Sequence, residues 1–128
     1  MCSICVPLYA DVASDHGLDA LIERVGVGNE PTGAGIPVAQ VEAANTSGDY
    51  APDENDVAFV DTTFVLRSGA SGILNHATQV GKRIYGSNAV GIAPNIPTVH
   101  VYNAEGFVLN DFLRTGSGNN PITPPSGV

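Results

Sequence analysis

The chain of 128 residues has the length of one ordinary domain, and its 43% apolar and 14% charged residues are typical of a globular protein. Thirteen acidic residues against five basic ones give a formal charge of −8, and Lys82 and Arg83 are the only adjacent basic pair, which argues against nucleic acid and membranes as partners. No stretch reaches the ~20 apolar residues that a membrane-spanning helix needs.

Residues 1–15 are expected to form an N-terminal segment that precedes the domain. Cys2 and Cys5 have the C-x-x-C spacing, but a thioredoxin-type pair would follow a strand, for which there is no room here. The apolar stretch 2–10 leaves two origins open, the remnant of a signal peptide and a propeptide junction.

The first regular elements that the pattern predicts are a helix and a strand. Apolar residues at i, i+3, i+4 and i+7 indicate an amphipathic helix over 18–25, with Asp15 as its cap and Gly26 at its end. A short apolar run over 36–41 then predicts a strand buried on both faces. Glu42 ends this strand, and we expect residues 43–56 to form a long surface loop.

A second strand is predicted at 57–60, with a continuation at 63–66. The apolar residues that follow recur at helical spacing on one face, and they are Ile73, Ala77, Val80 and Ile84. Asn75 stands near the start of this helix and Gly86 just beyond its end. Gly81 lies inside the helix, where it costs about 1 kcal/mol of propensity and usually signals close backbone packing.

A third strand is predicted over 98–102, and a short helix over 107–113 ends near Arg114. The strand places two pairs of residues on opposite faces, Val99 with Val101 and His100 with Tyr102. Residues 115–128 are rich in Gly, Ser, Asn and Pro and are expected to be a connection.

Strands that alternate with helices predict an α/β fold with a doubly wound, mostly parallel sheet. About three strands are visible, fewer than the ~5–6 of an average sheet, so we expect the sheet to be incomplete in this chain. Residues 16–128 would then be the N-terminal part of one domain.

Two polar residues stand where sheets of this kind carry out chemistry. Glu42 lies at the carboxyl end of a predicted strand, and His76 lies at the start of a predicted helix after a Gly-rich loop. Taken one at a time, each is better explained as an ordinary residue, Glu42 as a solvated acid at a strand end and His76 as a surface or capping residue. The motifs around them are therefore what distinguishes the two interpretations.

Three motifs resemble those of subtilisin-like serine peptidases. Residues 33–42, GAGIPVAQVE, resemble the family pattern G-x-G-[VI]-x-V-A-V-[IL]-D, with Glu42 in the place of the catalytic aspartate. Residues 76–81, HATQVG, resemble H-G-T-H-V-A-G, and residues 91–94, GIAP, resemble G-[VI]-A-P. The motifs occur in the family's order, and the resemblance covers most of this chain but less than half of a family domain.

The resemblance implies a subtilisin-like fold and a serine-type endopeptidase that acts on polypeptides, located outside the cell or in the cell envelope. It gives Glu42 the role of orienting acid and His76 that of the base. The nucleophilic serine and the oxyanion asparagine are expected after Val128, so the chain alone would be inactive without the remainder of its own peptidase domain. Ser71 precedes the histidine and lacks the flanking residues of a nucleophile.

Two other interpretations are left open, a degenerate subtilisin-like module that binds peptides or surfaces without catalysis, and an unrelated small acidic α/β domain. The sequence identifies no cofactor with certainty. The acidic residues in and beside the 43–56 loop predict a solvated surface, with a structural calcium site as the alternative, and they are Asp49, Asp53, Glu54, Asp56 and Asp61.

Overall fold

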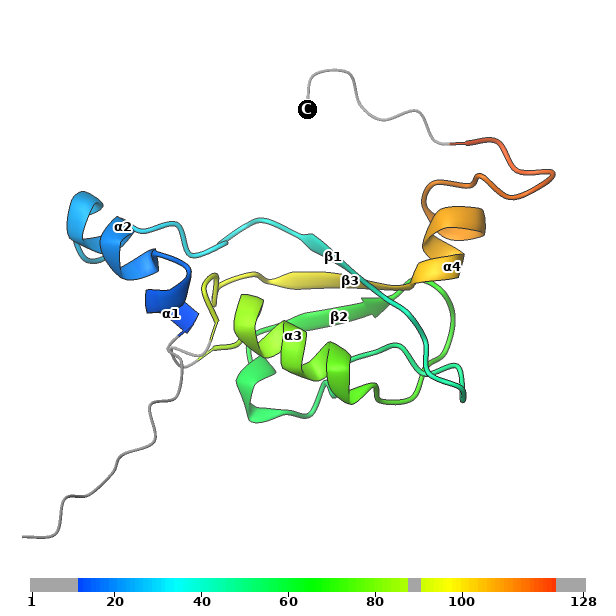
Figure 1. Ribbon diagram of the computed structural model, residues 1–128, viewed down its shortest axis with the longest axis horizontal. Helices are drawn as coiled ribbons and strands as arrows, with labels where there is room; N and C mark the ends of the chain where they lie inside the picture. Colours follow the sequence, from blue (N-terminus) through cyan, green and yellow to red (C-terminus); the bar gives the residue numbers. More distant parts are fainter. Residues whose placement is uncertain (1–11, 88–90, 122–128) are drawn as a thin grey trace, which may run out of the picture.

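A three-stranded parallel sheet organises the residues that the computed structural model describes, 12–87 and 91–121. Its strands are β1 (Val38–Glu42), β2 (Thr63–Leu66) and β3 (Thr98–Asn103), in the order β1-β3-β2 (Figure 1). Helix α3 (Asn75–Tyr85) connects β2 to β3 and lies against one face of the sheet. The predicted mixed α/β class and parallel pairing are confirmed, whereas the C-x-x-C segment lies outside the described residues.

Short helical elements complete the fold. They are α1 (Val12–Asp15), α2 (Leu18–Val25), the 3-10 helix η1 (Val57–Phe59), α4 (Ala104–Gly106) and the π-helical turn η2 (Phe107–Asp111). Helix α2 has the predicted bounds, but the prediction that Asp15 caps it is wrong. Asp15 is the last residue of α1, and Gly17 precedes α2 with φ 76°, a left-handed conformation that suits glycine and turns the chain between the two helices.

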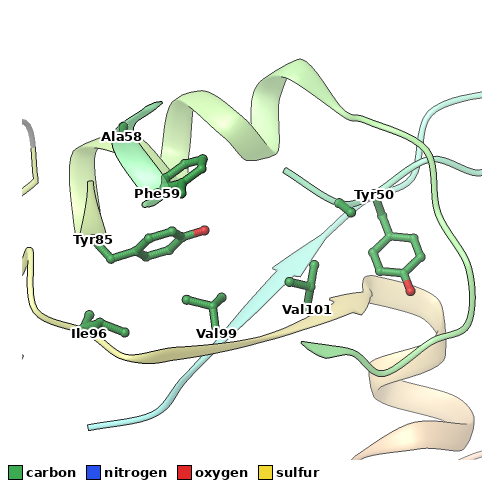
Figure 2. Close-up of a cluster of buried hydrophobic side chains, with 8 residues drawn as sticks. Tyr50, Ala58, Phe59, Tyr85, Ile96, Val99 and Val101 are labelled. Atoms are coloured by element: carbon green, nitrogen blue, oxygen red, sulfur yellow. The ribbon is translucent and has the colours of Figure 1, made fainter. Parts of the chain in front are cut away.

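The main core lies between α3 and the sheet. Figure 2 shows Val99 and Val101 projecting from β3 toward the side on which Phe59 and Tyr85 lie, and both valines are completely buried. The rings of Phe59 and Tyr85 have centroids 5.4 Å apart, and Phe64 of β2 contacts both rings. β3 supplies the centre of this core because it is the only described strand flanked on both sides.

The opposite face of β3 carries a second aromatic cluster. Tyr102 packs edge-on against Phe107 and Phe112, whose rings stack 4.9 Å apart. The predicted alternation of β3 is therefore confirmed. The helical segment starts earlier than predicted, at Ala104, because the Asn103 side chain accepts hydrogen bonds from the backbone N–H groups of the next turn.

The loop over residues 43–56 is confirmed as a connection without strands or helices, yet it is not wholly on the surface. Tyr50 is 1% exposed and belongs to the main core, together with Ala51. The Tyr50 hydroxyl donates a hydrogen bond to the Gly69 carbonyl, which ties this loop to the one that precedes α3.

The strand predicted at 57–60 is wrong, because this segment is the 3-10 helix η1. The Asp56 carboxylate accepts a hydrogen bond from the Ala58 N–H and caps the helix, and its partner Lys82 comes from α3. The helix buries Ala58 and Phe59 while Val57 stays exposed. The predicted continuation at 63–66 is the actual strand, β2.

β1 begins two residues later than predicted and is not buried on both faces. Its polar residues Gln40 and Glu42 are each 7% exposed, whereas Val41 is 39% exposed. The alternation is thus the reverse of an ordinary strand, since the polar side chains face α3. They are tolerated there because each finds a hydrogen-bond partner.

Helix α3 has the predicted start and end, and of the predicted apolar face Ala77 is buried as expected, whereas the two isoleucines are not. Ile73 is 58% exposed and Ile84 is 40% exposed. The side that faces the sheet instead consists of small residues and one large ring, and its buried members are Ala77, Thr78, Gly81 and Tyr85. The space beside Gly81 is filled as predicted, but by a side chain and not by a neighbouring backbone, because the phenol ring of Tyr85 occupies the place that a Cβ atom would need.

Candidate active site

Glu42 and His76 meet at the carboxyl edge of the sheet. Glu42 is the last residue of β1, and His76 is the second residue of α3. Atom Oε2 of Glu42 lies 3.7 Å from Nε2 of His76. The structure therefore brings together the two residues that the sequence singled out, although they are far apart along the chain.

The two side chains of this pair differ sharply in their surroundings. The Glu42 side chain is 8% exposed, whereas the His76 side chain is 72% exposed. The carboxylate is thus screened from water by the protein, whereas the imidazole is open to it. A molecule arriving from solvent can therefore reach the imidazole but not the carboxylate.

The ring atom that faces Glu42 is Nε2, so Nδ1 is directed away from the carboxylate. In the Ser-His-Asp arrangement the acid receives the Nδ1 hydrogen and Nε2 faces the nucleophile. At 3.7 Å the Nε2 to Oε2 distance also exceeds the ~3.2 Å limit of a good N–H to O hydrogen bond. The pair in this structure therefore differs from that arrangement both in the ring atom that faces the acid and in its distance.

Gln40 supports Glu42 from inside the molecule. Its Nε2 group donates to Oε1 of Glu42 at 2.8 Å and to the carbonyl oxygen of Ala77 at 3.0 Å. Its Oε1 atom accepts a hydrogen bond from the Tyr85 hydroxyl. The carboxylate is thus held at one oxygen by Gln40, while the other oxygen faces His76.

Tyr85 is the innermost member of this network and is 1% exposed. Burial and the nearby charge of Glu42 both raise the pKa of Tyr85 above its ordinary value, so its hydroxyl stays protonated and remains a donor. Within residues 12–87 and 91–121, no buried side-chain nitrogen or oxygen lacks a hydrogen-bond partner. The polar interior around Glu42 is therefore fully satisfied.

Ser71 is occupied by the backbone of its own loop. Its hydroxyl oxygen accepts hydrogen bonds from the N–H groups of Tyr50 at 2.7 Å and Ala51 at 3.0 Å, and it donates to the Gly72 carbonyl at 2.8 Å. These three bonds use the whole capacity of a hydroxyl group. Ser71 has a structural role, in agreement with its lack of nucleophile flanks.

Three of the acidic residues predicted to form a solvated loop or a calcium site have separate partners. Asp49 accepts from the Gly72 N–H and from Asn45, Asp53 accepts from the Asn55 N–H, and Asp56 pairs with Lys82 at 2.6 Å. In the part of the chain that the structure describes, no three His, Cys, Asp or Glu residues are grouped so that they could hold a metal ion. Calcium binding stays an untested alternative to the solvated loop.

The two other histidines lie away from this site. His16 lies in the turn between α1 and α2 and is exposed. His100 lies on the face of β3 that points away from α3, and its Nδ1 atom accepts a hydrogen bond from Nε of Arg67 at 3.1 Å. Neither residue contributes to the pair.

A groove of about 220 Å³ runs along the outer side of β1 and reaches Glu42. The strand itself forms one wall, and Val80, Ile84 and Tyr85 of α3 form the other. Among the described strands, β1 pairs only with β3, so its outer edge has no neighbouring strand. This edge of the sheet is open directly beside the candidate active site.

Sequence reasoning identified Glu42 and His76 but missed Gln40 and Tyr85. Gln40 had a visible signal, since it is the one polar residue within the run over 38–41 and stands where the subtilisin-like pattern has valine. Tyr85 had none, because a tyrosine at the end of a helix is common at surfaces.

Comparisons with models of protein families, with curated proteins and with solved structures found no significant match to the chain. Among the described residues, no helix is long and apolar enough to cross a membrane.

Proposed function

We propose that this chain supplies the acid and the histidine of a serine-type endopeptidase with a doubly wound, subtilisin-like fold. The observation that carries the proposal is the Glu42 and His76 pair, with its carboxylate buried and its imidazole open to solvent at the carboxyl edge of a parallel sheet. Its polypeptide substrate and its location outside the cell or in the envelope follow from the motif resemblance.

In this function His76 takes the proton from the attacking hydroxyl group and later gives it to the leaving amine. Glu42 stays ionised and stabilises the positive charge that the imidazole gains. Positioned proton transfer of this kind contributes ~10²–10⁴-fold to a rate. The serine and the oxyanion donors would come from the remainder of the domain. The open edge of β1 supports this, because further strands of that remainder could pair there and complete the sheet.

The test uses the protein extended beyond Val128 and a fluorophosphonate probe, which labels an activated serine. Labelling is expected in the wild type, and it should be lost in His76→Ala and strongly slowed in Glu42→Gln. His100→Ala serves as the matched control, since His100 lies on the other face of the sheet. Labelling that survives His76→Ala would contradict the proposal.

A second candidate function is a non-catalytic subtilisin-like module that binds peptides or surfaces. It is favoured by the 3.7 Å separation of Glu42 and His76 and by Nε2 facing the carboxylate, where the Ser-His-Asp arrangement has Nδ1. A folded, extended protein that takes up no fluorophosphonate but binds peptides would favour this candidate over the peptidase.

A further inference from the structure

We infer that Gln40 and Tyr85 are positioning residues that hold the Glu42 carboxylate toward His76 through a buried chain of hydrogen bonds. The chain runs from the Tyr85 hydroxyl to Oε1 of Gln40, and from Nε2 of Gln40 to Oε1 of Glu42. It ends where Oε2 of Glu42 faces His76. The assignment of a catalytic purpose to this chain rests on the proposed function, but the positioning itself does not.

Gln40 is well placed for this role because it lies two residues before Glu42 on the same face of β1. A glutamate side chain has three rotatable bonds, and a carboxylate held by a single partner at its far end cannot sample them freely. The second donor bond of Gln40, to the Ala77 carbonyl, anchors the amide to the first turn of α3. That turn also carries His76, so the amide links the acid to the element that presents the base.

Tyr85 determines which end of the Gln40 amide faces Glu42. An amide offers an acceptor at one end and donors at the other, and only the donor end can bind a carboxylate. The protonated Tyr85 hydroxyl donates to the oxygen end, so the NH₂ group turns to Glu42 and to the Ala77 carbonyl. Gly81 makes room for the phenol, because a side chain at that position would overlap the ring.

The network gives the buried position of Glu42 a physical reason. A carboxylate that is 7% exposed loses most of its hydration and needs hydrogen-bond donors in its place. Gln40 provides one that is charge-assisted and oriented. A valine at this position, as in the subtilisin-like pattern, would leave the longer glutamate without this support.

The test is nuclear magnetic resonance on the 128-residue chain itself, with three variants. Gln40→Met keeps the size of the side chain and removes the amide, and Tyr85→Phe removes only the hydroxyl. Gln79→Met is the matched control, because Gln79 is an exposed glutamine on α3. Three-bond couplings to Cγ report the χ1 rotamers of Glu42, and exchange with water reports the burial of the Gln40 amide protons.

The wild type should show one χ1 rotamer for Glu42 and slowly exchanging Gln40 amide protons. Gln40→Met should average the Glu42 couplings over several rotamers, and Tyr85→Phe should speed the Gln40 proton exchange at least ~5-fold, since the amide loses its orienting partner. Gln79→Met should change neither quantity. An unchanged single rotamer in folded Gln40→Met, or unchanged exchange in Tyr85→Phe, would overturn the inference.

Tyr85→Phe keeps the aromatic ring in the core, so it decides the inference even where Gln40→Met does not fold. In the extended protein, Gln40→Met should lower kcat about as much as Glu42→Ala with little change in KM, and the two losses should not add. Additive losses would mean that Gln40 does not act through Glu42. A chain that shows the ordered network but no activity after extension contradicts the proposed function and leaves the positioning intact.

Discussion

Glu42 and His76 face each other across the junction of β1 and α3, with 3.7 Å between Oε2 and Nε2. The carboxylate belongs to the interior and the imidazole to the surface, so the two residues should respond differently to substitution. Removal of a buried, hydrogen-bonded group costs stability, whereas removal of an exposed ring does not.

His76→Ala should therefore separate function from folding. Because 72% of the His76 side chain is exposed, the free energy of unfolding should change by less than ~0.5 kcal/mol. In the extended protein the same substitution should lower kcat by ~10²–10⁴-fold, the usual contribution of a positioned base. Denaturant unfolding and peptide hydrolysis measure the two effects, and a large loss of stability would mean that the imidazole has a structural role.

Ser71→Ala should lower the stability of the fold and leave the labelling of the active site unchanged. The N–H groups of Tyr50 and Ala51 lose their acceptor, which should destabilise the fold by about 1–3 kcal/mol. Fluorophosphonate labelling of the extended protein should persist, because the Ser71 hydroxyl is committed to its loop. Loss of labelling from a Ser71→Ala protein that remains folded would show that Ser71 is the nucleophile after all.

Gly81→Ala tests the packing that makes room for Tyr85. Alanine raises helix propensity by about 1 kcal/mol, but its methyl group would overlap the buried phenol. Overpacking of a core costs about 1–3 kcal/mol, so the net effect should be a loss of stability in thermal or denaturant unfolding. In a Tyr85→Leu background the clash is absent, and Gly81→Ala should then be neutral or stabilising.

The ion pair between Asp56 and Lys82 should make the free energy of unfolding depend on pH in the acidic range. The hydrogen bond from Lys82, and that from the Ala58 N–H, hold the pKa of Asp56 below its ordinary value. A carboxylate with a lowered folded-state pKa contributes stability that is present above its unfolded-state pKa and is lost as pH falls through the folded-state value. Lys82→Met should raise the Asp56 pKa and reduce this acid dependence.

Carbon-detected titration of the Asp56 side chain and unfolding at several pH values measure both effects. Arg83→Met is the control, because Arg83 is exposed and forms no ion pair within the described part of the chain. An Asp56 pKa that responds equally to the two substitutions would show that general charge, and not the Lys82 contact, sets its value.

The sequence by itself determined the elements whose signals are local. The bounds of α2 and the alternating faces of β3 follow from periodicity, and glycine marks the ends of both α2 and α3. The pairing of Glu42 with His76 was also predictable, because strand ends and the following helix starts gather at one edge of a parallel sheet.

The tertiary structure decided what depends on partners from distant segments. Residues 57–60 have strand-forming side chains, but the Asp56 cap and burial of Phe59 under α3 favour a 3-10 helix. The side chains of Gln40 and Glu42 can point into the interior only because α3 supplies the Tyr85 hydroxyl and the Ala77 carbonyl as hydrogen-bond partners. A buried polar group has no favourable place until its partner is in position, so three-dimensional packing and not local pattern fixes the surroundings of the candidate acid.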